Sequence, residues 1–265
     1  MATGKMGDMR TTSFLLISLP VAVLLSLASC SRARPAPPRP EHPRPDFERT
    51  QWLNLNGQWE FRFDSKDLGL DQNWQNPNTP FDREITVPFC WESKLSGVHD
   101  LSGHQIGWYR RKITVPAEWS SRRVWLRFEA VDWEARVWVN GQEVGRHEGG
   151  YTPFAFDITD QVKPGESATI VVRAYDPTDR ELPTGKQIVF WYTFTSGIWQ
   201  TVWLEARPET YLDSLKLVPR HGPDGWSLAV EAAVAGSDGA AHVRVASPDE
   251  TVSPAEGDVE LRDGR

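Results

Sequence analysis

VWVNGQEVG, residues Val137–Gly145, is the stretch that decides the fold. Two short apolar runs flank the dipeptide Asn140-Gly141. Both of these residues tolerate a positive φ angle, which a two-residue turn between antiparallel strands requires. Apolar residues on both sides of such a turn give each strand a side that can be buried. The stretch therefore predicts a β-hairpin within a larger sheet.

The same period of two runs through most of the chain from Trp52 onward. Apolar residues occupy alternate positions in the runs 59–63, 109–115, 124–130 and 168–174. Strict alternation is typical of strands with one buried and one exposed face, and no stretch shows a convincing helical period. We therefore predict an all-β protein, with about eight to ten strands between residues 52 and 206 arranged as a jelly-roll β-sandwich.

The composition changes after residue 207, although the alternation continues. Residues 208–265 hold far fewer aromatics, and this part runs for only about 55 residues. An immunoglobulin-like sandwich takes ~100 residues. We therefore predict a jelly-roll domain over 50–207 and a partial immunoglobulin-like β-sandwich over 208–265, and we expect the chain to be a fragment.

The N-terminus has the features of a targeting segment. Lys5 and Arg10 precede an apolar run, 14–27, that is shorter than the ~20 residues needed to span a bilayer. The run ends in Leu27-Ala28-Ser29-Cys30, which resembles the lipobox of bacterial lipoproteins. We predict a lipoprotein signal peptide over 1–30, lipidation of Cys30 and an exported, membrane-anchored protein. An ordinary signal peptide with a chance cysteine is the alternative.

Residues 31–49 form a linker rich in proline and arginine. Six prolines lie between Ser31 and Pro45, and such a stretch favours extended polyproline II rather than a packed core. The formal net charge of the whole chain is −7. Because nucleic-acid binding needs a basic surface to neutralise phosphates, we expect no nucleic-acid partner, and a neutral ligand is compatible with the charge.

Five motifs occur in order along the chain: LNGQWEF at 55–61, VPFCWES at 87–93, WYRRKITVP at 108–116, VWVNGQEVGRHEGGYTPFAFDIT at 137–159 and TSGIWQTVWLE at 195–205. Together they resemble the N-terminal sugar-binding domain of glycoside hydrolase family 2, which includes β-galactosidases, β-glucuronidases and β-mannosidases. The resemblance covers about residues 50–207.

The resemblance implies hydrolysis of terminal β-O-glycosidic bonds in carbohydrate metabolism, without a cofactor. In that family a barrel of ~250 residues follows the two sandwiches and carries the two catalytic glutamates. Retaining hydrolysis needs two carboxyls about 5 Å apart. We find no such pair here, so we predict a β-galactosidase-like sugar-binding portion with no catalytic residue in this chain. A stand-alone surface glycan-binding lipoprotein and a purely structural sandwich are the alternatives.

The resemblance implies two sugar contacts. An aspartate in the family reaches the substrate pocket on the barrel, and Asp176 in VRAYDPTD matches it; the alternative is that Asp-Pro only opens a turn. A loop before GWYRR approaches the pocket in some members, and His104 stands nearest that place. We expect both residues in the sugar-binding site.

The stretch 183–205 adds further candidates. Lys186 and Gln187 can donate hydrogen bonds to sugar hydroxyls, or they are solvated loop residues. Trp191 and Tyr192 offer a stacking face, whereas Trp199 and Trp203 alternate with other residues as core or interface anchors do.

The remaining chemistry-bearing residues give no clear site. Cys90 lies among apolar residues and is expected to be a buried, inert thiol. The histidines lack recognised zinc-ligand spacing, so we expect no metal. Nothing in the sequence pairs the remaining candidate acids, which are Glu92, Asp132, Glu134 and Glu181.

Overall fold

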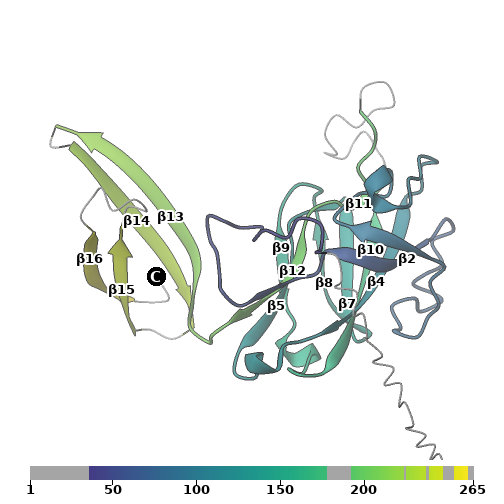
Figure 1. The fold of residues 1–265 in the computed structure, drawn as a ribbon, viewed down its shortest axis with the longest axis horizontal. Helices are drawn as coiled ribbons and strands as arrows, with labels where there is room; N and C mark the ends of the chain where they lie inside the picture. Colours follow the sequence, from purple (N-terminus) through teal and green to yellow (C-terminus); the bar gives the residue numbers. More distant parts are fainter. Residues whose placement is uncertain (1–35, 178–191, 224, 237–238, 247–253, 262–265) are drawn as a thin grey trace, which may run out of the picture. The chain divides into compact units, whose positions relative to one another are not determined.

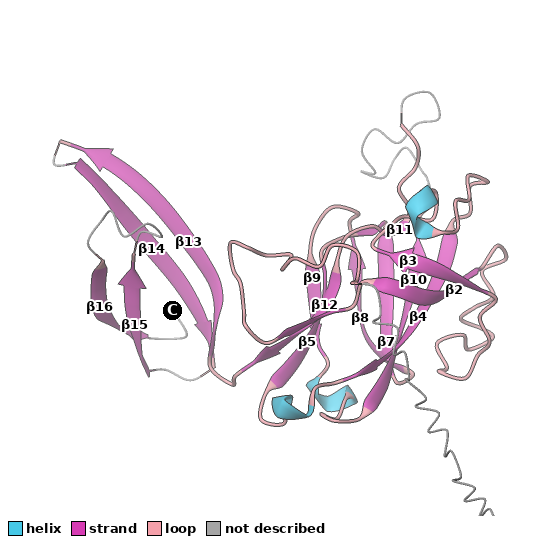
Figure 2. Ribbon diagram, viewed as in Figure 1, coloured by secondary structure: helices cyan, strands magenta, loops and turns pink. Residues whose placement is uncertain are grey.

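The structure is a computed structural model that describes residues 36–177, 192–223, 225–236, 239–246 and 254–261. These residues are almost entirely strands and loops (Figures 1 and 2). The helical elements described are three single 3-10 turns: η1 (Lys94–Ser96), η2 (Ala117–Trp119) and η3 (Thr159–Gln161). The predicted all-β fold class is confirmed.

Two antiparallel sheets form the sandwich. The larger sheet has the strand order β3 (Arg83–Val87), β2 (Gly57–Phe63), β4 (Ile106–Thr114), β10 (Ser167–Tyr175), β7 (Glu134–Val139) and β8 (Gln142–Glu148). The smaller sheet has the order β1 (Trp52–Asn54), β12 (Val202–Arg207), β5 (Arg123–Phe128) and β9 (Phe154–Asp157). A two-stranded sheet joins β6 (Val131–Asp132) to β11 (Gly197–Ile198).

The hairpin that the sequence predicts joins β7 to β8. Val139 pairs with Gln142, and the turn residues Asn140 and Gly141 have φ angles of 51° and 82°. The described residues 52–207 hold twelve strands, two of which are only two residues long, so the expected eight to ten falls slightly short.

The core lies between the two sheets and follows the predicted alternation. In β2, Trp59 and Phe61 are buried while Gln58 and Glu60 are exposed. The inward side chains of both sheets form one cluster whose largest members include Trp59, Phe61, Tyr109, Leu126, Phe128 and Ile170. Removing this area from water is the main term that stabilises the sandwich, at about 25 cal/mol per Å² of apolar surface.

A second apolar cluster explains several of the tryptophans. Trp108 and Trp138 stack at 5.4 Å between ring centroids, and Trp74 meets Trp108 edge-on at 5.9 Å. Arg62 lies 3.6 Å over the ring of Trp74. Aromatic pairs and cation–π contacts of this kind stabilise a packed surface. These rings therefore hold the connection between β2 and β3 in place rather than facing a ligand.

Glu205 of β12 is buried among arginines. Its Oε1 lies 2.5 Å from Arg207 Nε, 2.8 Å from Arg49 Nε and 4.0 Å from Arg127 Nη1. Burial lowers the pKa of Arg49 and of Arg127, because a charged guanidinium loses hydration there. One carboxylate therefore neutralises several partly desolvated cations.

Two further hairpins follow the sandwich. β13 (Tyr211–Gly222) pairs with β14 (Gly225–Ala235), and β15 (Gly239–Val245) pairs with β16 (Ala255–Leu261). Trp226 and Leu217 are well exposed here, at 77% and 53%. The hairpins supply the further β structure expected over 208–265.

Candidate functional site

Asp176 follows the last residue of β10 and is fully buried. Its backbone N–H donates to the carbonyl of Gln105 at 2.8 Å, just before β4 begins. Its carboxylate Oδ2 accepts a 2.6 Å hydrogen bond from the hydroxyl of Ser196. Asp176 therefore does more than open a turn, because the hydroxyl of Ser196 and the backbone carbonyl of Gln105 both hydrogen-bond to it.

Ser196 joins Asp176 to a second buried carboxyl. The Ser196 backbone N–H donates to Glu92 Oε2 at 3.1 Å. Glu92 comes from the connection between β3 and β4 and is 8% exposed, while Ser196 and Asp176 have no exposed surface. Residues 92, 176 and 196, far apart in the chain, thus meet at one end of the sandwich, near β11 and η1 (Figure 2).

The turn that carries Ser196 is held from below. The Ile198 N–H donates to the hydroxyl of Tyr109 at 3.3 Å, and Gly197 has a φ of 82°. A Cβ at Gly197 would lie 2.8 Å from the ring of Trp91. Only glycine fits a left-handed backbone this close to two aromatic side chains.

Burial governs the electrostatics of the cluster. It raises the pKa of Glu92, against the opposing effect of the hydrogen bonds from Ser196. Burial and the nearby Glu92 raise the pKa of the Cys90 thiol to about 11, so at neutral pH the thiol is protonated and a poor nucleophile. Cys90 is only partly buried, whereas the sequence predicts a buried thiol, and its raised pKa favours the expected lack of reactivity.

His104 is turned away from this cluster. Its ring stacks on Phe63 at 3.9 Å, its Nδ1 lies 3.2 Å from the Ser65 hydroxyl, and its Nε2 lies 3.7 Å from Asp100 Oδ2. The structure therefore ties His104 to local partners. Its neighbour Gln105 is the residue that contacts Asp176, through its carbonyl.

Some of the other predicted contacts lie outside the residues that the structure describes, and the rest lie within them. Lys186, Gln187 and Trp191 lie outside the described residues. Tyr192 is 61% exposed. Trp203 is fully buried, as expected of a core anchor, whereas Trp199 is half-buried and donates from Nε1 to the Gly150 carbonyl at 2.8 Å.

Exposed aromatic surface accompanies the buried acids. Tyr151 is 51% exposed and meets Trp199 edge-on at 5.6 Å between ring centroids. Trp199 is three residues from Ser196, so these rings belong to the same end of the sandwich. Flat rings with a fixed orientation can cover the C–H face of a pyranose, while buried acceptors pair with hydroxyls.

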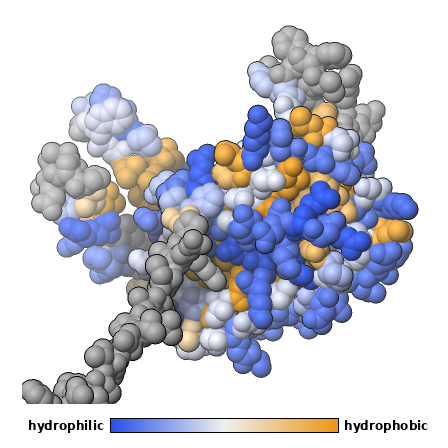
Figure 3. Space-filling model, turned by 45° about the vertical axis from the view of Figure 1, so that its right-hand side comes forward, coloured by the Kyte–Doolittle hydropathy of each residue, from blue (hydrophilic) through white to orange (hydrophobic). Residues whose placement is uncertain are grey.

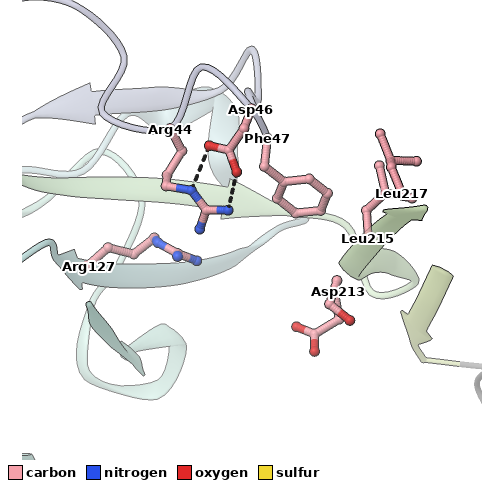
Figure 4. A pocket seen from close by; sticks show the side chains of 8 residues that line it. Arg44, Asp46, Phe47, Arg127, Asp213, Leu215 and Leu217 are labelled. Carbon is pink, nitrogen blue, oxygen red and sulfur yellow. Dashed lines mark hydrogen bonds and ion pairs between the residues drawn. The ribbon is translucent and has the colours of Figure 1, made fainter. Parts of the chain in front are cut away.

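A pocket of about 380 Å³ lies elsewhere (Figure 4). In this pocket, Arg44 donates two hydrogen bonds, of 2.9 and 2.7 Å, to the carboxylate of Asp46. The other lining residues are Phe47, Arg127, Asp213, Ser214, Leu215 and Leu217. Two arginines and two aspartates balance, and no predicted sugar contact lines the pocket. We therefore do not assign it to the sugar.

Metal chemistry finds no support in the part of the chain that is described, where no three metal-binding side chains converge. The sequence does not identify Ser196 as a site residue. For that reason it also assigns no partner to Glu92. The Thr-Ser-Gly turn in the motif 195–205 was the available signal, since a serine before a glycine can present both its N–H and its hydroxyl.

The fold is a sandwich of two antiparallel β-sheets. Residues 53–208 match the family described as "Glycosyl hydrolases family 2, sugar binding domain". The chain belongs to this family.

Curated relatives include a β-glucuronidase of Bacteroides fragilis, 32% identical over 62% of this chain, and a β-galactosidase of Thermoanaerobacter pseudethanolicus, 34% identical over 43%. The matched regions are 22% and 15% of those two proteins, so the chain spans less than a quarter of either one. A solved structure of a Ruminococcus gnavus β-glucuronidase with uronic isofagomine shares the fold, with a TM-score of 0.67 and 24% identity over 83% of this chain and 40% of that chain.

Proposed function

We propose that this chain is the sugar-recognition portion of a β-glycosidase that hydrolyses terminal β-O-glycosidic bonds, β-galactosidase-like in its chemistry. The match of residues 53–208 to a sugar-binding domain carries this proposal. The catalytic carboxylate pair would come from a barrel in another part of the protein. The short share of each relative that the chain spans supports this division.

Within the chain, Asp176 would contact the sugar. Its buried carboxylate accepts from Ser196, which lies three residues before Trp199, and the Trp199 ring meets the exposed ring of Tyr151. Because Asp176 has no exposed surface here, the contact requires the loops at this end of the sandwich to move aside when a sugar binds. Lys186 and Gln187 would add hydrogen-bond donors, and His104 would hold the neighbouring loop.

The test is a two-dimensional NMR titration of the chain with methyl β-D-galactoside and methyl β-D-glucuronide. We expect millimolar affinity, since hydrogen bonds that compete with water contribute only about 0.5–1.5 kcal/mol each. Resonances around 176 and 196 should shift, and Asp176→Asn should abolish the shifts while the exposed Asp71→Asn keeps them. Binding that survives Asp176→Asn unchanged would remove Asp176 from the site.

We also propose that the protein is exported and anchored to a membrane through a lipid on Cys30. The support is the Leu27–Cys30 motif after a short apolar run. Among the described residues, no helix has the length and apolar content needed to cross a bilayer.

A further inference from the structure

Ser196 uses both of its donors on acids that come from different parts of the chain. The hydroxyl donates to Asp176 at 2.6 Å and the backbone N–H donates to Glu92 at 3.1 Å. A hydroxyl has one proton, so donating it to Asp176 fixes the Ser196 side chain in one orientation. The distance of 2.6 Å falls in the usual range of O–H···O hydrogen bonds.

We propose that Ser196 is a positioning residue that fixes the carboxylate of Asp176 for sugar binding, and that Glu92 in turn fixes Ser196. This inference rests on the proposed function, in which Asp176 is the sugar contact. Ser196 itself does not touch the sugar.

Each link of this relay is anchored in rigid structure. The backbone of Asp176 is fixed by the Gln105 carbonyl. The residues after Ser196 are fixed by the Tyr109 hydroxyl and by strand pairing of Gly197 with Asp132. The 2.6 Å hydrogen bond couples the side-chain torsions of Asp176 and Ser196. A preset side chain loses less conformational entropy on binding.

A purely structural role explains the cluster less well. Burying a carboxylate costs free energy even when it is hydrogen-bonded, and packed apolar side chains of similar volume are often as stable or more stable. Two carboxyls, of Asp176 and Glu92, are nevertheless buried around one serine. Glu92 accepts from the Ser196 N–H at 3.1 Å, and the Ser196 hydroxyl donates to Asp176 at the shorter distance of 2.6 Å.

The experiment uses the whole chain with the variants Ser196→Ala, Asp176→Asn and their combination, and exposed Ser121→Ala as the matched control. Two quantities are measured: the side-chain ¹³Cγ resonance of Asp176, assigned by its loss in Asp176→Asn, and the affinity for the two methyl glycosides. Melting temperatures report on folding.

We expect Ser196→Ala to move the Asp176 ¹³Cγ resonance and to weaken glycoside binding about fivefold, as the loss of one hydrogen bond implies. In the Asp176→Asn background, Ser196→Ala should cause no further loss of affinity. Ser121→Ala should match the wild type throughout. A ¹³Cγ resonance that stays in place in Ser196→Ala, or losses that simply add in the double variant, would overturn the positioning role.

The pair Glu92→Gln and Glu92→Met keeps the proposal testable if Ser196→Ala unfolds. Glutamine retains an oxygen that accepts from the Ser196 N–H, and methionine does not. Only Glu92→Met should move the Asp176 resonance, and equal shifts in both variants would count against the relay. If the resonance moves in Ser196→Ala while the wild type binds neither glycoside, the positioning role stands and the proposed sugar contact fails.

Discussion

Gly197 packs directly beneath the hydroxyl of Tyr109, so close that a Cβ at Gly197 would overlap that oxygen. The Tyr109 hydroxyl also accepts from the N–H of Ile198, the next residue. This contact fixes the turn that presents Ser196. Because Tyr109 is fully buried in β4, its hydrogen bond attaches the turn to the larger sheet.

Gly197→Ala should therefore destabilise the sandwich by more than backbone strain alone. Gly103 provides the matched control, because its φ of 79° is nearly the same but nothing lies within 4 Å of its Cβ position. We expect Gly103→Ala to cost about 1 kcal/mol and Gly197→Ala about 2 kcal/mol more, as forced overpacking does. Urea unfolding measures the loss of stability in each variant. Equal losses would show that Tyr109 and Trp91 move to make room for the added Cβ at Gly197.

The raised pKa of Glu92 predicts a pH-dependent stability difference between the wild type and Glu92→Gln. Burial raises the folded-state pKa above the unfolded value, so the contribution of protonated Glu92 is complete below about pH 4. It is lost as pH rises through the folded pKa. The stability of the wild type relative to Glu92→Gln should therefore fall as the pH rises from about 4 toward neutral.

Two ionisable groups near Glu92, Cys90 and Tyr109, do not interfere with this test, and His99, whose Nδ1 lies 2.9 Å from the Glu92 carbonyl oxygen, is present in both proteins that are compared. Cys90 and Tyr109 both have pKa values raised well above neutral by burial, so neither ionises in that pH range. Exposed Glu118→Gln is the control for changing one acid. Urea unfolding at each pH gives the difference in unfolding free energy between the wild type and Glu92→Gln. A wild type that gains stability relative to Glu92→Gln as the pH rises would contradict burial as the cause of the raised Glu92 pKa.

Removing the charge of Glu205 should be costly. Glu205→Gln leaves Arg49, Arg127 and Arg207 near one another without the carboxylate that neutralises them, and breaking a buried pair costs about 3–5 kcal/mol. Glu231→Gln is the control, since its pair with Lys216 is about two-thirds exposed and should change stability by less than about 1 kcal/mol. If chemical denaturation gave similar losses of unfolding free energy for Glu205→Gln and Glu231→Gln, water would have to reach the arginines around Glu205.

Cys30→Ala should abolish lipid attachment. In cells given labelled palmitate, the wild-type chain should take up label and partition with membranes, whereas Cys30→Ala should remain unlabelled. The control is Cys90→Ala, which changes the other of the two cysteines and keeps Cys30. It should take up label as the wild type does. Label retained in Cys30→Ala would contradict the lipobox assignment.

Residues 31–265 should not turn over aryl β-glycosides. Retaining hydrolysis needs an acid and a nucleophilic carboxylate about 5 Å apart on either side of the bond, and Asp176 and Glu92 are instead buried around Ser196. The measurement is release of 4-nitrophenol from the galactoside, glucuronide, mannoside and glucoside. Turnover above a buffer blank that disappears in Asp176→Asn or Glu92→Gln would place catalysis inside this sandwich.

The sequence by itself determined the fold class, the hairpin at Asn140-Gly141 and the buried faces of the strands. These features are local: a period of two and a turn that needs positive φ can be seen in a few consecutive residues. The resemblance of the five motifs also led to the family and to Asp176, without telling what holds that residue.

Only the tertiary structure decided how the acids are used. Glu92, Asp176 and Ser196 are more than 80 residues apart at their widest, and their meeting depends on strand order and on a crossing connection that no local pattern encodes. The same holds for Glu205, whose arginine partners come from three segments, and for His104, whose ring stacks on Phe63 and contacts Ser65, both far from it in the sequence. Long-range contacts fix side-chain direction, and in this protein the contact with Ser196 distinguishes Asp176 from a residue that only opens a turn.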